Sequence, residues 1–208
     1  MIKAWAADVT PLYDRECYER YHAMVPDFRK EKADRLRLHE MKAQSIGVWT
    51  LWEKIREHYD LPEEAPHNFS HSGSLVMCAV CMDGCDVQVG CDVEMERELR
   101  LKLAERRFCR EEYETIIAEQ DKDKRIGLFY RYWVLKESFM KATGKGMALP
   151  VNAFSIRLGN PPLLIKKPKE FPEAYYYMEY KIEQVPYKMA VCSTDKEIDA
   201  KLHMELRL

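Results

Sequence analysis

The sequence lacks a long hydrophobic run, an internal repeat, a flexible linker and a strong excess of either charge. Its 208 residues carry a formal net charge of -2, so a general electrostatic attraction to nucleic acid is not expected. No apolar run approaches the roughly 20 residues that span a bilayer, so no membrane segment is expected. The opening stretch, MIKAWAADVT, lacks the apolar block of a signal peptide. We therefore expect an ordinary globular protein in the cytoplasm.

The seven cysteines are an odd number, and in a reducing compartment we expect them as free thiols. The stretch CAVCMDGCDVQVGC offers four possible zinc ligands, which are Cys78, Cys81, Cys85 and Cys91. Structural zinc sites usually combine two short pairs separated by a longer loop, and this spacing fits that pattern poorly. The favoured interpretation is that these cysteines are small apolar residues inside strands.

Hydrophobic periodicity predicts an α+β fold. Strand patterns cover residues 2–9, 74–82, 86–95, 152–158, 174–182 and 187–193, and helical patterns cover 27–58, 98–108, 110–120 and 122–144. Asp83-Gly84 is a hairpin signal between the second and third strands, and residues 60–73 contain turn formers. We expect two similar α/β lobes, residues 1–97 and 98–208, each a small, mostly antiparallel sheet packed on a long helix.

Acidic residues occur where the pattern predicts burial. In VQVGCDVEM, residues 87–95, Asp92 and Glu94 are two apart and so share one side of a strand. An unpaired buried carboxylate costs several kcal/mol, so an arginine, solvent or a metal ion must compensate it. On the predicted helix 122–144, Glu137 and Lys141 stand one turn apart, away from an apolar stripe formed by Leu128, Tyr132, Leu135 and Phe139.

A surface Glu137–Lys141 ion pair would produce the same helix pattern. The carboxylates on the strand favour another interpretation, in which Asp92, Glu94 and Glu137 hold one hard divalent cation such as Mg²⁺. Lys141 would then place a positive charge against a phosphate group of a ligand.

Three blocks in this order resemble the 4′-phosphopantetheinyl transferases. They are NFSHSG at residues 68–73, VGCDVE at 89–94 and WVLKESFMKATGKGM at 133–147. The closer similarity is to the two-lobed, surfactin-synthetase-activating type rather than to the short trimeric holo-acyl-carrier-protein synthases. The resemblance extends over about residues 67–192 and is weak before them.

The resemblance implies a reaction. The 4′-phosphopantetheine arm of coenzyme A would pass to a serine of an acyl or peptidyl carrier protein, leaving adenosine 3′,5′-bisphosphate. By similarity, Asp92, Glu94 and Glu137 would hold Mg²⁺ against the pyrophosphate, and Glu137 would also take the serine proton. Lys141 would bind the pyrophosphate. Since the site would lie between two lobes of one chain, we expect a monomer.

By the same resemblance, Ser70 and His71 would contact the 3′-phosphate of coenzyme A, although His71 could equally be a turn residue that bonds its neighbours. A basic segment offers further cations for that phosphate, namely Arg29, Lys30, Lys32 and Arg35, of which we favour Arg29 and Lys32. The family's Gly-Lys-Pro block before NFSHSG is missing, and the loop there has Glu63 and Glu64 instead. A carrier could dock on Leu103, Arg106, Arg107 and Phe108, unless these residues pack inside the lobe.

Two alternatives remain open from the sequence. One is a homologue that binds coenzyme A or a carrier protein without catalysis, which the altered loop near residue 62 would favour. The other is a Mg²⁺-dependent phosphohydrolase that uses the same carboxylates.

Overall fold

The computed structural model describes residues 1–84, 86–99 and 101–208. The helices are α1 (Arg15–Met24), α2 (Asp27–Asp34), α3 (His39–Tyr59), α4 (Leu101–Arg107), α5 (Arg110–Ala118) and α6 (Lys122–Ala142). Short 3-10 turns are η1 (Thr10–Tyr13), η2 (Gly146–Ala148) and η3 (Val151–Ala153). The strands are β1 (Ile2–Asp8), β2 (His67–Ser72), β3 (Leu75–Cys81), β4 (Val89–Met95), β5 (Ser155–Arg157), β6 (Leu163–Lys166), β7 (Tyr176–Tyr180), β8 (Tyr187–Ser193) and β9 (Ile198–His203).

The strands form two main sheets and a small ribbon. The first sheet has the order β2-β3-β1-β9, the second has the order β4-β8-β7, and β5 pairs with β6. All pairs are antiparallel except β1 with β9, which are parallel. The predicted α+β class, with small, mostly antiparallel sheets on long helices, is confirmed.

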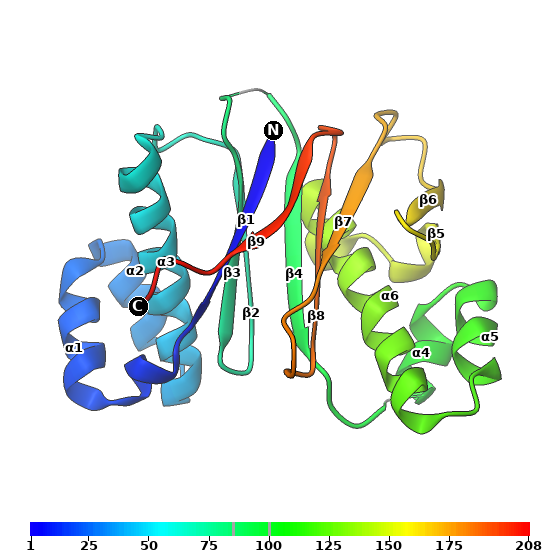
Figure 1. The fold of residues 1–208 in the computed structure, drawn as a ribbon, viewed down its shortest axis with the longest axis horizontal. Helices are drawn as coiled ribbons and strands as arrows, with labels where there is room; N and C mark the ends of the chain where they lie inside the picture. The colour runs from blue at the N-terminus through cyan, green and yellow to red at the C-terminus, as the bar shows by residue number, and fades with distance from the viewer. Residues whose placement is uncertain (85, 100) are drawn as a thin grey trace.

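The two sheets lie against each other, with helices on the outside (Figure 1). Alternation along β3 explains this arrangement, because Met77 and Ala79 belong to the apolar cluster between the sheets, whereas Val76 and Cys78 pack in the cluster with α3. The described chain is therefore layered as helix, sheet, sheet and helix. The edge strands β2 and β4 of the two sheets run next to each other, and the site described below lies at this seam.

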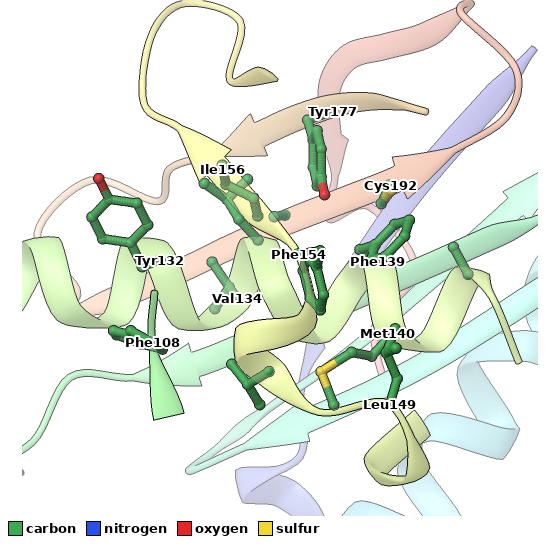
Figure 2. Close-up of a cluster of buried hydrophobic side chains, with 14 of the residues drawn as sticks. Phe108, Tyr132, Val134, Phe139, Met140, Leu149, Phe154, Ile156, Tyr177 and Cys192 are labelled. Atoms are coloured by element: carbon green, nitrogen blue, oxygen red, sulfur yellow. The ribbon is translucent and has the colours of Figure 1, made fainter. Parts of the chain in front are cut away.

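Helix α6 covers the outer face of the second sheet. Figure 2 shows its aromatic core, in which Phe139 packs 4.6 Å from Phe154 between ring centroids and lies near Tyr177 and Cys192. The predicted apolar stripe is confirmed, since Tyr132, Leu135 and Phe139 are buried and Leu128 is partly buried.

A buried ion pair lies beside this aromatic core. Lys136 and Glu112 are each 1% exposed, and Nζ of Lys136 lies 3.0 Å from a Glu112 carboxylate oxygen. The same ammonium group donates to the carbonyl oxygens of Val151 and Phe154 at 2.8 and 2.7 Å. Because Glu137 follows Lys136 directly, this anchor also constrains where Glu137 can lie.

Several local predictions are wrong. Asp83-Gly84 does not close a hairpin, because β3 pairs with β1 and β2 while β4 pairs with β8 in the other sheet. The segment 67–72 is not a turn but strand β2, and its hairpin with β3 turns at Gly73, which has φ of 56°. The patterns also missed α1, β6 and β9, which are short or largely polar.

The predicted division into residues 1–97 and 98–208 stays a prediction, and strand pairing crosses it twice. Strand β4 lies before residue 97 and pairs with β8, whereas β9 returns from the C-terminal end to pair with β1. Backbone pairing between distant segments leaves no trace in local periodicity.

The candidate zinc cysteines are separated among apolar clusters. Cys78 lies in the cluster beside α3, and Cys81 and Cys91 lie between the sheets, all as buried free thiols. Burial raises the pKa of Cys91 to about 12. Cys85 is outside the described residues. Within the described parts of the chain, no helix is long and apolar enough to cross a membrane.

Candidate active site

The seam between β2 and β4 is joined by side chains instead of a backbone ladder. The N–H groups of Cys91 and Val93 on β4 donate to Asn68 Oδ1 and Ser70 Oγ at 3.1 and 3.2 Å. Ser72 Oγ accepts in the same way from the N–H of Met95 at 3.1 Å. The period-2 spacing of residues 68, 70 and 72 places these three side chains on one face of β2, the face toward β4.

Lys141 extends from α6 across β4 to β2. Its Nζ lies 2.8 Å from Asp92 Oδ1, 3.0 Å from Ser70 Oγ and 3.0 Å from the Cys91 carbonyl oxygen. Burial lowers the pKa of Lys141, but the charge and hydrogen bond of Asp92 together with the charges of Cys91 and Glu137 outweigh it, so the net pKa is raised and the ammonium stays charged. Ser70 in turn donates to Asp92 Oδ1 at 2.7 Å.

Two further carboxylates surround this pair. Glu94 on β4 has its pKa raised from 4.5 to about 7, first by burial and then by the charge of Asp92, with a smaller contribution from Glu137. Glu137 on α6 is half-buried, and burial followed by the charge of Asp92 raises its pKa as well. The structure therefore brings the three predicted acidic residues into one electrostatic cluster, with Lys141 beside it.

This cluster fits a hard cation, although it is not a closed cage. No group of three His, Cys, Asp or Glu side chains in residues 1–84, 86–99 and 101–208 is assembled to hold a metal ion by itself. Asp92 Oδ2, however, is buried without a hydrogen-bond partner. Mg²⁺ commonly binds through one or two carboxylates and completes its shell with water and substrate phosphates. An orphaned oxygen beside two carboxylates of raised pKa is the donor set that such an ion uses.

A group of cations lies near His71, on the other side of β2. Neighbouring atoms displace part of the water around the His71 imidazole and so lower its pKa. The charges of Lys141, Arg29 and Lys32 lower this pKa further. Arg29 is 6% exposed, and its Nε donates to the Ser45 carbonyl oxygen at 2.9 Å. Burial lowers the pKa of Arg29 to about 10.

The four basic candidates at α2 fall into two kinds, those paired with a carboxylate and those without such a partner among the described residues. Lys30 pairs with Asp27, and Arg35 pairs with Glu31, both in exposed ion pairs. Arg29 instead lies 5.4 Å from the ring centroid of Trp49, with no carboxylate paired to it among the described residues. Arg29 and Lys32 are thus the two cations of this segment that act electrostatically on His71.

Two expectations change on the structure. Ser70 is buried, and its hydroxyl is engaged by Lys141, Asp92 and the Val93 N–H, so its side chain faces the carboxylates. Phe108 cannot dock a carrier protein, because it is 4% exposed and packs against Phe129.

The sequence pattern did not identify Asn68 and Ser72 as site residues, although their alternation with Ser70 is typical of a strand. It also missed Gln44, which donates from Nε2 to the Gly73 carbonyl oxygen at 2.7 Å and so fixes the turn after β2.

The fold and the site define a class of protein in which carboxylates from a strand, β4, and a helix, α6, meet beside a group of basic side chains. The family model of the 4′-phosphopantetheinyl transferase superfamily matches residues 88–192, which contain β4, α6 and all but the last residue of β8. The chain belongs to this superfamily.

Named relatives agree with this assignment. The chain is 36% identical over 146 residues to 4′-phosphopantetheinyl transferase Sfp of Bacillus subtilis, an alignment that covers 70% of this chain and 62% of that protein. It is 27% identical over 228 aligned positions to 4′-phosphopantetheinyl transferase psf-1 of Bacillus pumilus, covering 99% of this chain and 94% of that protein. The similarity to the first of these relatives thus spans less than two thirds of its length.

Among solved structures, the holo-[acyl-carrier-protein] synthase of Thermotoga maritima aligns with a TM-score of 0.42 at 20% identity. That alignment covers 53% of this chain and 64% of the synthase. A similarity of this size carries no argument about function.

Proposed function

We propose that this protein transfers the 4′-phosphopantetheine group of coenzyme A to a serine hydroxyl of an apo carrier protein, with Mg²⁺ as cofactor and adenosine 3′,5′-bisphosphate as the second product. The observation that carries the proposal is the meeting of Asp92, Glu94, Glu137 and Lys141 at the seam between the sheets. Membership of the superfamily supports the reaction class.

In this proposal Asp92, Glu94 and Glu137 hold the metal ion. When bound there, Mg²⁺ would neutralise negative charge on the pyrophosphate of coenzyme A. Asp92 offers its unpartnered Oδ2, while its Oδ1 stays oriented by Lys141 and Ser70. Phosphoryl transfer of this kind depends mainly on positioning and charge stabilisation, and these buried contacts supply a fixed arrangement.

Glu137 is the proposed general base for the carrier serine. Among the described residues, no hydrogen bond or ion pair ties up its carboxylate, which leaves an oxygen free to accept the serine proton. Lys141 places a permanent positive charge beside the reacting phosphates.

The nucleotide end of coenzyme A would lie against His71, Arg29 and Lys32. Arg29 has no carboxylate partner in the described chain, and its lowered pKa reflects a charge that an anion would stabilise. Arg29 and Lys32 take the place of the cation of the missing Gly-Lys-Pro block. They present positive charge from α2 instead of from the loop at residues 61–66. The carrier-protein partner, the monomeric state and the cytoplasmic location stay predictions.

The test is the mass of several apo carrier proteins after incubation with this protein, coenzyme A and Mg²⁺. The proposal expects at least one carrier to gain one phosphopantetheine group, and omission of Mg²⁺ or addition of a chelator to prevent the gain. Each carrier is first shown to be competent with another transferase.

The same experiment decides between the alternatives. Binding of coenzyme A without any mass gain would favour a non-catalytic homologue, which the exposed Glu63 and Glu64 in the loop before β2 support. Release of adenosine 3′,5′-bisphosphate in the absence of a carrier would favour a phosphohydrolase.

A further inference from the structure

Ser72 makes two hydrogen bonds at the end of β2, and both reach β4. Its Oγ donates to Glu94 Oε2 at 2.8 Å and accepts from the Met95 N–H at 3.1 Å. A serine hydroxyl has one proton, so the N–H donor from Met95 leaves that proton directed at the carboxylate. In its contact with Glu94, the Ser72 hydroxyl is therefore the donor and the carboxylate is the acceptor.

The turn after Ser72 is held by contacts to helix α3 and to strand β8. Gln44 Nε2 donates to the Gly73 carbonyl oxygen at 2.7 Å, and the N–H of Ser74 donates to Tyr187 Oη at 3.0 Å. Gly73 has φ of 56°, and a Cβ there would lie only 2.9 Å from the Met95 sulfur. The backbone that carries Ser72 thus cannot shift without breaking contacts to α3 and β8.

Glu94 depends on this hydroxyl more than Asp92 depends on Ser70. Asp92 is oriented by the Lys141 ammonium as well as by a serine, whereas Ser72 is the one hydrogen-bond donor to the Glu94 carboxylate within the described residues. Removing Ser72 would leave a half-buried carboxylate free to rotate away from Asp92 and Glu137.

We propose that Ser72 is a positioning residue of the active site, which directs Glu94 toward Asp92 and Glu137 and thereby sets the affinity for the divalent cation. This inference rests on the proposed function for the identity of the site. In this inference Ser72 orients a carboxylate of β4, and it does not bind the nucleotide end of coenzyme A. Donors that orient metal ligands typically change metal affinity by about 10- to 100-fold when they are removed.

The experiment compares Ser72→Ala with Ser72→Thr, which keeps the hydroxyl on a strand-compatible side chain. Ser74→Ala is the matched control, because Ser74 is two residues away on the same turn and its hydroxyl contacts Tyr187 Oη and no carboxylate among the described residues. Binding of Mn²⁺ to the whole protein is measured by electron paramagnetic resonance, without carrier or turnover. We expect about a 10- to 100-fold weaker affinity for Ser72→Ala and values near wild type for the other two variants.

Hydrogen exchange at the Met95 amide reports on the strand edge independently. We expect faster exchange in Ser72→Ala only, because that N–H loses its acceptor. Faster exchange or a lower Tm together with unchanged Mn²⁺ affinity would overturn the proposal and leave Ser72 a purely structural role.

The two proposals can fail separately. If Mn²⁺ affinity falls as expected but no carrier gains mass with the wild-type protein, Ser72 positions Glu94 and the transferase proposal fails. If the wild-type protein binds no Mn²⁺ even with coenzyme A present, both proposals are contradicted.

Discussion

At the scale of single residues, the site contains more negative charge than its neighbours neutralise. Lys141 satisfies one oxygen of Asp92, and the other oxygen is buried without a partner. Glu94 and Glu137 both have raised pKa values, because burial and the charge of Asp92 disfavour their ionised forms. A divalent cation would relieve both effects, which is why the charge balance itself favours a metal-dependent function.

We expect Glu137→Gln to lower the rate of carrier modification by at least about 100-fold, since a proton acceptor and a metal ligand are lost together. Binding of adenosine 3′,5′-bisphosphate should change little, because the cations on α2 and at His71 are untouched. Glu114→Gln on α5 is the control, since Glu114 forms only an exposed ion pair with Arg110. A Glu137→Gln rate within a few-fold of wild type would remove Glu137 from the mechanism.

The raised pKa of Glu94 predicts a pH dependence of stability in the metal-free protein. Its folded-state pKa of about 7 exceeds the ordinary value of 4.5, so its contribution is present below pH 4.5 and is lost as pH rises to about 7. The loss is about 3 kcal/mol at most, and less where solvent screens the half-buried group. Urea unfolding at pH 5 and pH 8 measures it.

Mg²⁺ should restore part of this stability at pH 8, because it binds the ionised form. Glu94→Gln serves as the control and should show a weaker pH dependence and a weaker response to Mg²⁺. The same pH dependence in both proteins would mean that Glu94 is not the titrating group.

At the scale of elements, close approach of α6 to β4 brings Glu137 and Lys141 to the seam. Gly90 on β4 permits this approach, since a Cβ there would collide with the Ser138 carbonyl oxygen and the Ala142 nitrogen of α6. The sequence indicated both elements, yet it could not show that a glycine two residues before Asp92 sets the distance between them.

We expect Gly90→Ala to destabilise the protein by about 1–3 kcal/mol and to reduce transfer, because α6 must move away from β4. Gly127→Ala on the same helix is the matched control, where a Cβ would meet its nearest neighbour at 3.5 Å and the helix should gain up to about 1 kcal/mol. Thermal unfolding and carrier mass gain measure both effects. A neutral Gly90→Ala variant would contradict the packing argument.

Element prediction succeeded where apolar periodicity was strong and failed where strands are short or polar. The 21 residues of α6 and the apolar strands β1, β3, β4 and β8 were recognisable from their own residues. Strand β2 was not recognisable, because its polar residues are also common in turns. In the structure, these side chains accept hydrogen bonds from the backbone of β4.

At the scale of the whole molecule, two sheets pack face to face and their edges meet at the site. Strand β9 returns from the C-terminal end to the first sheet, and Tyr180 on β7 donates to the Asp199 carbonyl oxygen on β9 at 2.7 Å. The sheets are therefore linked at both edges, by β2 with β4 and by β7 with β9. That Asp92 and Glu94 share one side of a strand could be predicted from their spacing, whereas this arrangement depends on pairing between strands far apart in the sequence, such as β1 with β9 and β4 with β8.

The central claim is that Asp92, Glu94 and Glu137 form one cation site at this seam. Titration of the coenzyme A-bound protein with Mg²⁺ by calorimetry tests it most directly. The account predicts one site per chain in the wild type and a large loss of affinity in each of Asp92→Asn, Glu94→Gln and Glu137→Gln. Unchanged Mg²⁺ binding in all three variants would contradict it.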